Sequence, residues 1–264
     1  MVIFIGDDDI FIDKNYAIEY IDAFKNKRVG VARSRQIIFV NNTIKQVSRI
    51  EYNGKTKIFK KGLDAYLNFF FDTTSIAGLA FRMNKQLFTL LDGDTSMYPQ
   101  LELAGKVCIV RDVAQIDKYL IGVRSHEGQL NVLSYSLDGK KTNIVEDFLK
   151  IYQRLNNKAK KYKTKIISKR EYMNTLLGFL PLFFPYNALK NGKVNTLRFI
   201  FDIKKHSNGL FFKPFLLLSL VFILLPNKVI KTLLSKVNNL QLRKSLSNDR
   251  IDFYNNIFTN QGKL

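Results

Sequence analysis

Cysteine and histidine are scarce in this sequence of 264 residues, which contains one cysteine and two histidines. Cys108 alone cannot form an internal disulfide bond, and together with His126 and His206 it cannot supply the four ligands of a structural zinc site. The apolar start of the chain, Met1–Ile5, has neither the basic residues nor the cleavage site of a secretory signal. We therefore expect a reducing, cytoplasmic setting.

Acidic residues are scarce in the second half of the chain. The whole sequence has 42 basic and 22 acidic side chains, a formal charge of +20, but residues 151–264 hold 21 basic and only 4 acidic ones. Residues 1–150 are nearly balanced, with 21 basic and 18 acidic side chains. An excess of this size is typical of proteins with an anionic partner. We expect two parts, an α/β domain at 1–150 and a basic, partly apolar helical region at 151–264.

The composition and the periodicity of the first part predict an ordinary folded domain. Hydrophobic residues make up 46% of the chain and charged residues 24%, which excludes a disordered, collagenous or coiled-coil protein. Alternating strand and helix patterns predict an α/β fold that opens on a buried strand of a parallel sheet. The expected strands are Met1–Gly6, Gly30–Val40, a hairpin over 43–60 closing at Asn53–Gly54, Ser75–Arg82, Lys106–Val110 and Leu120–Val123. The expected helices are Asp13–Asn26, Gly62–Phe71, Lys85–Leu91 and Met97–Lys106.

Three consecutive acidic residues, Asp7–Asp9, follow the first apolar strand in the run GDDDIFID. Carboxylates at the end of a buried strand repel one another and lose solvation, so a cation that neutralises them is expected. Hard oxygen ligands favour Mg²⁺ or Mn²⁺, which keep open positions that the phosphates of a nucleotide can fill. Alternatively, the three residues only end the strand and cap the next helix. The residues alone leave both interpretations open.

The order of these features resembles the second half of a family 2 glycosyltransferase of the GT-A fold. An apolar strand enters Asp-Asp-Asp and is followed by a helix, the strand at Gly30, SIAGLAFR (75–82) and TSMYPQLELAGKV (95–107). The Tyr98-Pro99-Gln100 segment is particularly similar to abequosyltransferase-like members, which build surface polysaccharides. The resemblance covers residues 1–125 and implies an incomplete GT-A-like mixed sheet flanked by helices.

In that family an Asp-x-Asp motif binds a divalent metal and the nucleotide-sugar. The resemblance implies Asp7 and Asp9 as ligands of Mg²⁺ or Mn²⁺, with Asp9 the more direct one. It also implies Asp7 and Asp8 as contacts of the nucleotide-sugar donor. The implied activity is transfer of a sugar from that donor to a lipid-linked sugar or polysaccharide acceptor.

A general base is the other catalytic group that the resemblance implies. Inverting members of the family use a carboxylate to deprotonate the acceptor hydroxyl. Where many members have an acidic pair, this chain has Gln100-Leu101. The remaining candidates are Asp94, Asp92 and Glu102, with Asp94 preferred. Alternatively, the run from Asp92 to Asp94 is only a turn that caps a helix.

The front of the family's fold has no counterpart in this sequence. Family members begin with βα units that hold the base and the ribose of the nucleotide. We therefore expect an amino-terminally truncated domain, and three explanations are open: a truncated reading frame, a second chain that supplies those units as a partner, or a degenerate copy without turnover. A sheet without its first strands exposes an apolar edge, which invites association. The alternative function is a non-catalytic remnant or partner subunit that associates with the membrane and with another chain.

Residues 151–170 predict a cationic helix, with eight basic side chains among tyrosines and isoleucines. Such a helix can bind RNA or an anionic bilayer, and the apolar runs that follow at 176–186 and 214–226 favour the bilayer. The second run is 13 residues long, short of the roughly 20 that a spanning helix needs. We interpret it as an interfacial helix, with a single crossing and a buried core helix as alternatives. The predicted location is the cytoplasmic face of the cell membrane, held peripherally at its anionic surface, with no nucleic-acid partner.

Overall fold

The computed structural model forms two compact units that do not follow the order of the sequence. The first comprises Met1–Leu130, Leu155–Ile166 and Asn238–Leu264, and the second Asn131–Arg154 and Ile167–Val237. One helix, α5 (Ile144–Lys161), therefore contributes to both units. The structure describes residues 1–6, 9–40, 43–47, 54–83, 98–124, 136–137, 140–141, 144–178, 188–189, 192–206, 220–221 and 223–245.

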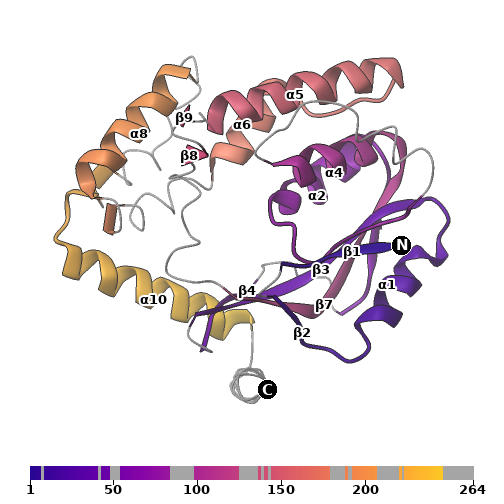
Figure 1. Cartoon of the computed structure of the whole chain (residues 1–264), viewed down its shortest axis with the longest axis horizontal. Coiled ribbons are helices and arrows are strands. Elements are labelled where there is room, and N and C mark those ends of the chain that lie inside the picture. The colour runs from indigo at the N-terminus through magenta and orange to yellow at the C-terminus, as the bar shows by residue number, and fades with distance from the viewer. Residues whose placement is uncertain are drawn as a thin grey trace. The chain divides into compact units, whose positions relative to one another are not determined.

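A mixed sheet of seven described strands forms the centre of the first unit (Figure 1). Five strands follow the order β1-β6-β3-β7-β2, while β4 pairs with β3 and β5 pairs with β7. The strands are β1 (Val2–Phe4), β2 (Ile10–Phe11), β3 (Val29–Val40), β4 (Thr43–Val47), β5 (Lys57–Phe59), β6 (Leu79–Phe81) and β7 (Asp112–Arg124). The β3–β7 pairing is parallel, whereas the other described pairings of the sheet are antiparallel. The prediction of an α/β fold with a mixed sheet flanked by helices is confirmed.

Helices cover both faces of this sheet (Figure 1). One face carries α1 (Tyr16–Lys25), and the other carries α2 (Leu63–Asn68), the 3-10 helix η1 (Phe70–Thr74) and α4 (Pro99–Val110). The predicted strand at Lys106–Val110 is wrong, because α4 continues to Val110. Every residue of α4 from Leu101 to Ile109 is buried. A helix buried on all sides has no exposed stripe, so periodicity does not distinguish it from a buried strand.

Two of the predicted strand pairings are also wrong. β1 is not a buried strand between parallel neighbours, because it pairs antiparallel with β6 and leaves Val2 exposed. The hairpin expected over 43–60 does not form, because β4 turns back onto β3 and β5 joins β7. Val40 pairs directly with Thr43, so two residues connect β3 to β4, the shortest common hairpin. The helix expected at 85–91 lies outside the described residues.

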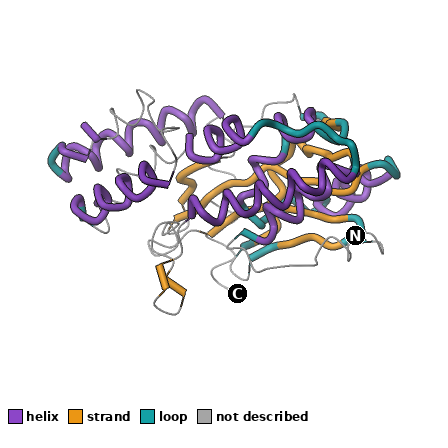
Figure 2. Tube along the Cα trace, turned by 90° about the horizontal axis from the view of Figure 1, so that it is seen from above, coloured by secondary structure: helices purple, strands orange, loops and turns teal. Residues whose placement is uncertain are grey.

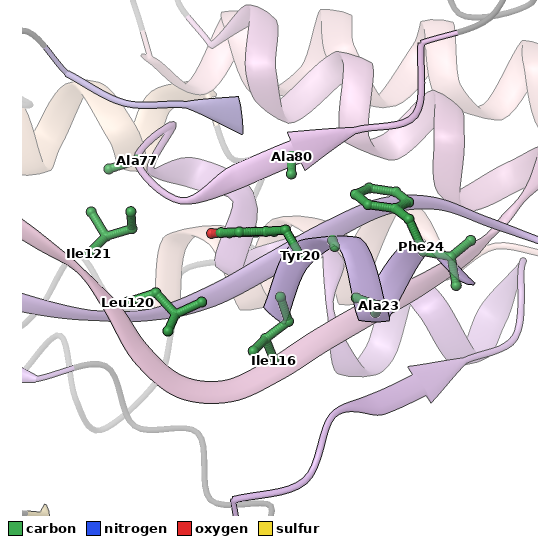
Figure 3. Close-up of a cluster of buried hydrophobic side chains, with 11 residues drawn as sticks. Tyr20, Ala23, Phe24, Ala77, Ala80, Ile116, Leu120 and Ile121 are labelled. Carbon is green, nitrogen blue, oxygen red and sulfur yellow. The ribbon is translucent and has the colours of Figure 1, made fainter. Parts of the chain in front are cut away.

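Tyr20 of α1 is the largest polar-tipped side chain in the core beneath the sheet. Figure 3 shows its ring among apolar side chains of the sheet, with the hydroxyl directed toward Ala77 and Ile121. The hydroxyl donates to the carbonyl of Gly78 at 2.7 Å and lies 2.8 Å from Ser34 Oγ. Gly78 has a φ of +75°, and a Cβ there would lie 2.9 Å from Ser34 Oγ. A glycine is therefore required at the point where α1, β3 and β6 meet.

Removal of the Tyr20 hydroxyl is expected to change the free energy of unfolding by an amount that depends on pH. Burial raises the pKa of Tyr20 to about 12, above the 10 of an exposed tyrosine. Between pH 10 and pH 12 the tyrosine keeps its proton in the folded chain and loses it in the unfolded chain. The folded wild-type protein therefore loses about 3 kcal/mol of stability as the pH rises from below 10 toward 12. We expect Tyr20→Phe to be less stable than the wild type at pH 8 and to close that gap by pH 12. Urea unfolding across this range measures it, and Tyr162→Phe, an exposed tyrosine, is the control. Parallel stability curves for Tyr20→Phe and wild type would contradict the assignment.

The described part of the second unit is mainly helical (Figure 2). Its elements include part of α5, then α6 (Lys169–Gly178), α8 (Lys193–His206), most of α10 (Asn227–Ser245) and a small pair of strands, β8 (Ser136–Leu137) and β9 (Lys140–Lys141). The prediction of one cationic helix over 151–170 is wrong, because α5 ends at Lys161 and α6 begins at Lys169. Most of the apolar run 214–226 lies outside the described residues. None of the described helices is both long and apolar enough to cross a membrane.

The carboxyl-terminal end of α5 carries an unusual residue at its cap. Lys163 has a φ of +51°, a left-handed conformation in which glycine usually stands after a helix. The backbone N–H of Lys163 donates to the Lys160 carbonyl at 3.1 Å, and the N–H of Thr164 donates to the Ala159 carbonyl at 2.9 Å. These bonds satisfy carbonyls of the last turn and end the helix. The cap therefore keeps its hydrogen bonds at the cost of left-handed strain in a residue with a side chain.

Removing that strain is expected to stabilise the first unit. We predict that Lys163→Gly raises the free energy of unfolding by about 1 kcal/mol, because glycine adopts a positive φ without a steric penalty. Lys163→Ala keeps the Cβ and is expected to bring no such gain. Urea unfolding followed by circular dichroism compares the three proteins, and a loss of stability in Lys163→Gly would show that the lysine side chain supports the cap.

Candidate functional site

The acidic run occupies the connection from β1 to β2, where Asp9 holds the turn together. Asp9 Oδ2 accepts the backbone N–H of Gly6 at 2.9 Å, and the N–H of Asp9 donates to the Gly6 carbonyl at 3.2 Å. Asp9 Oδ1 accepts the backbone N–H of Arg124, at the end of β7, at 3.2 Å. The carboxylate thus fixes both the turn and its position against the sheet. Asp7 and Asp8 lie outside the described residues.

These bonds bear on whether Asp9 suits a metal. Each carboxylate oxygen has two lone pairs, so accepting one N–H bond leaves coordination by the same oxygen sterically and electronically feasible. Hydrogen bonds from backbone groups also orient the carboxylate, as they do for metal-ligating carboxylates in general. Among the described residues, no group of three or more His, Cys, Asp or Glu side chains is arranged to hold a metal ion.

The structure places three of the segments that carry the family resemblance close to one another. β1, which leads into the acidic run, pairs with β6 of the SIAGLAFR segment, and the N–H of Gly78 donates to the Phe4 carbonyl at 3.0 Å. Gln100, from the Tyr98-Pro99-Gln100 segment, donates through Nε2 to the Thr74 carbonyl at 2.8 Å. Residues 74–78 therefore contact the other two segments. We name this stretch the central loop.

Of the three residues proposed as the general base, the structure describes one. Asp94 and Asp92 lie outside the described residues. Glu102 lies within α4, is buried, and pairs with Lys106 one helical turn away at 2.8 Å. Burial of two opposite charges together accounts for both side chains without a catalytic role. Cys108 is also buried, and burial raises the pKa of its thiol far above the range of a reactive cysteine.

Arg82, which the resemblance included, has a structural role in this fold. Its guanidinium donates to the carbonyls of Val29 at 2.9 Å, Asn26 at 3.1 Å and Phe24. It also lies over the Phe24 ring, 5.3 Å from the ring centroid. The side chain therefore satisfies carbonyls at the end of α1 and binds that helix to the sheet.

Sequence reasoning missed a polar stretch in the middle of β3. Its four consecutive residues are all buried, namely Arg33, Ser34, Arg35 and Gln36. Gln36 Nε2 donates to Ser75 Oγ at 3.2 Å and to the Ala77 carbonyl, so the stretch borders the central loop. The signal was present in the sequence, because four polar residues interrupt a strand whose two flanks are apolar.

In this stretch, burial carries the largest electrostatic cost for Arg33. Its Nη2 donates to Gln36 Oε1 at 3.3 Å, while its buried Nε has no hydrogen-bond partner among the described residues. Burial lowers the pKa of Arg33, and the charge of Asp72 on η1 opposes that change. Burial likewise raises the pKa of Asp72, and Arg33 opposes it. The two charges therefore stabilise each other next to the central loop.

A second buried ion pair lies farther along β3. Arg35 Nε lies 2.5 Å from Asp117 Oδ1, and Asp117 Oδ2 accepts the backbone N–H of Gly54 at 2.6 Å. Asp117 reaches these partners because β7 bulges there, with Ser34 opposite Ile116 and Arg35 opposite Tyr119. The pair fixes the segment before β5 and accounts for both charges structurally.

Comparison with known proteins does not extend this description. No protein-family model, curated protein or solved structure matches the chain.

The Arg33–Asp72 interaction yields a testable prediction. Arg33→Gln leaves Asp72 partly buried without an opposite charge, which we expect to cost about 2 kcal/mol at pH 7.5. Without Arg33 the pKa of Asp72 rises further, which favours its protonation in acid, so we expect the cost to be smaller at pH 4.5 than at pH 7.5. The stabilisation from the proton on Asp72 is present at low pH and disappears as the pH rises through its pKa in the folded chain.

Urea unfolding at both pH values separates this effect from lost packing. We expect Arg33→Gln/Asp72→Asn to regain part of the loss at pH 7.5 and to show little change between the two pH values. An equal cost of Arg33→Gln at both pH values, with no recovery in the double variant, would mean that the two charges are not coupled.

Proposed function

We propose that this protein is a metal-dependent glycosyltransferase with a GT-A-like domain, similar to family 2 enzymes, that acts in the synthesis of cell-surface polysaccharide. The supporting observation is the meeting of the three motif-bearing segments at the central loop, through the bonds of Gly78 to Phe4 and of Gln100 to Thr74. These segments are distant in the sequence and contact one another within one folded unit. The donor in this proposal is a nucleotide-sugar, and the acceptor is a lipid-linked sugar or a polysaccharide.

The proposed donor site is the turn between β1 and β2. Asp9 and Asp7 would hold Mg²⁺ or Mn²⁺, and Asp7 and Asp8 would contact the nucleotide. The metal supplies positive charge that stabilises a departing diphosphate. The hydrogen bonds of Asp9 to Gly6 and Arg124 keep its carboxylate oriented without a ligand, which reduces the ordering that binding requires.

The proposed acceptor chemistry is deprotonation of a sugar hydroxyl by a carboxylate. Asp94 is the preferred base, followed by Asp92. Glu102 is the weakest of the three, because its carboxylate is buried and already paired with the Lys106 ammonium at 2.8 Å. The proposed location is the cytoplasmic face of the cell membrane, with the chain held peripherally.

A second candidate function is supported by the same turn. Both oxygens of Asp9 already accept backbone N–H bonds, which suffices to explain the residue as a structural element. On that basis the chain would be a non-catalytic partner subunit that associates with the membrane and, along the β1 edge of the sheet, with another chain. Metal-dependent nucleotide binding distinguishes the two functions.

Isothermal titration calorimetry provides this test. We expect UDP, GDP, CDP or dTDP to bind the purified chain in the presence of Mn²⁺ and to lose at least tenfold in affinity when Mn²⁺ is replaced by EDTA. Asp7→Asn/Asp9→Asn is expected to abolish the metal-dependent component. The matched control is Asp22→Asn, which removes an exposed carboxylate paired with Lys25 at 2.7 Å on α1.

The outcome decides between the two candidates. Binding that the control keeps and the double variant loses supports the enzyme and justifies a screen of acceptors. No binding of any nucleotide to folded wild-type protein would reject the enzyme for this chain and favour the partner subunit.

A further inference from the structure

Two lysine-rich segments that are far apart in the sequence lie side by side in the first unit. Lys60 and Lys61 precede Gly62, and a Cβ on Gly62 would lie 3.1 Å from Thr164 Cγ2 and 3.2 Å from the Lys165 carbonyl oxygen. The φ of Gly62 is +87°, so glycine also suits the backbone there. This close approach places the segment before α2 against the cap of α5.

Both segments are attached to the end of α4. The N–H of Gly62 donates to the Cys108 carbonyl at 2.7 Å, and Thr164 Oγ1 lies 3.3 Å from the Ile109 carbonyl oxygen. These carbonyls belong to the last turn of α4, whose groups lack partners within the helix. The juxtaposition is therefore built into the fold by hydrogen bonds on both sides.

The result is a concentrated positive charge, which we name the lysine patch. Its members are all exposed and are Lys60, Lys61, Lys160, Lys161, Lys163 and Lys165. Two carboxylates lie at its base, where Asp64 accepts the N–H of Lys60 at 2.7 Å and Asp112 accepts that of Lys61 at 3.0 Å. The patch thus combines six lysine side chains with these two carboxylates. Compensation of helix dipoles at the ends of α4 and α5 explains one or two of these lysines but not six.

The cap residue itself points to a role for the charge. Lys163 adopts a positive φ, for which glycine is the better residue, so a lysine here carries a conformational cost. Strain of this kind persists where a side chain serves a purpose that the backbone alone does not. The purpose that fits its neighbours is binding of an anion.

An anionic bilayer fits the patch better than a nucleic acid. Tyr162 stands within the patch with 49% of its surface exposed, and the Lys158 ammonium lies 5.6 Å from its ring centroid. An exposed tyrosine flanked by lysines is typical of a membrane–water interface.

We propose that the lysine patch binds the headgroups of anionic phospholipids and so attaches the chain to a membrane surface. This inference concerns attachment alone, so it holds whether or not the chain transfers a sugar. It also differs from the sequence-based prediction, which assigned membrane binding to a single helix over 151–170. In the structure, the surface combines two lysines before α2 with the cap of α5.

Flotation of the full chain with vesicles tests the proposal in the absence of metal and nucleotide. The vesicles are phosphatidylcholine alone or phosphatidylcholine with phosphatidylserine in a 7:3 ratio. We expect binding to the second kind only, with affinity that falls as salt rises. Lys61→Gln/Lys163→Gly/Lys165→Gln should weaken it by about a hundredfold, because each lysine near an anionic leaflet contributes about fivefold.

The matched control is Lys14→Gln/Lys25→Gln/Lys27→Gln, which removes the same charge from exposed positions around α1. It should change the affinity by less than fivefold. The single variant Lys163→Gly, which relieves strain, shows whether lost binding reflects lost folding, because it should bind about fivefold more weakly while remaining at least as stable as wild type.

Three outcomes would overturn the proposal. The first is equal binding to both kinds of vesicle. The second is an equal loss in the patch variant and in the control, which would mean that total charge and not the patch decides binding. The third is tighter, patch-dependent binding of a single-stranded RNA than of anionic vesicles, which would assign the patch to nucleic acid.

Discussion

The parallel pairing of β3 with β7 is the contact on which the rest of the first unit depends. These are the two longest strands, and each remaining strand joins them directly or through β6. Gln115 of β7 strengthens the pairing from its side chain, since Nε2 donates to the Arg33 carbonyl at 3.1 Å. α1 covers one face of the pair and α4 the other, so both helices lose their packing surface if the strands separate. Buried parallel strands are usually apolar throughout, yet here their centre is polar.

That polar centre links stability to the candidate site. Arg33 and Gln36 lie in the interior of β3, and Gln36 reaches the central loop. A charged residue in this position costs free energy of desolvation, which Asp72 offsets only in part because burial dominates the pKa of both groups. An apolar pair would pack there at lower cost. Gln36, which accepts a hydrogen bond from Arg33, instead contacts the loop that meets β1 on one side and Gln100 on the other.

Local patterns predicted the elements that have one buried face. α1 and β3 lie close to their expected bounds, because each shows the period of its own structure in sequence. The sequence predicts α4 as a helix over Met97–Lys106 but assigns a strand to its last turn, which lies in a helix buried on nearly every side. Pairings set by distant residues, such as β5 with β7, were missed because periodicity carries no information about partners. The lysine patch was predicted only in part for the same reason, because its two segments are distant in the sequence and meet at Gly62. At the candidate site, the acidic run was apparent from the sequence, but the anchoring role of Asp9 requires Arg124, which is remote along the chain.

α4 relates the two proposed binding surfaces to each other within the first unit. Its first turn contacts the central loop through Gln100, and its last turn carries the lysine patch through Cys108 and Ile109. A helix of 12 residues is roughly 18 Å long. If lipid headgroups lie at one end of this helix, the central loop stands about one helix length away from them. α4 thus sets the spacing between the lysine patch and the central loop within the first unit.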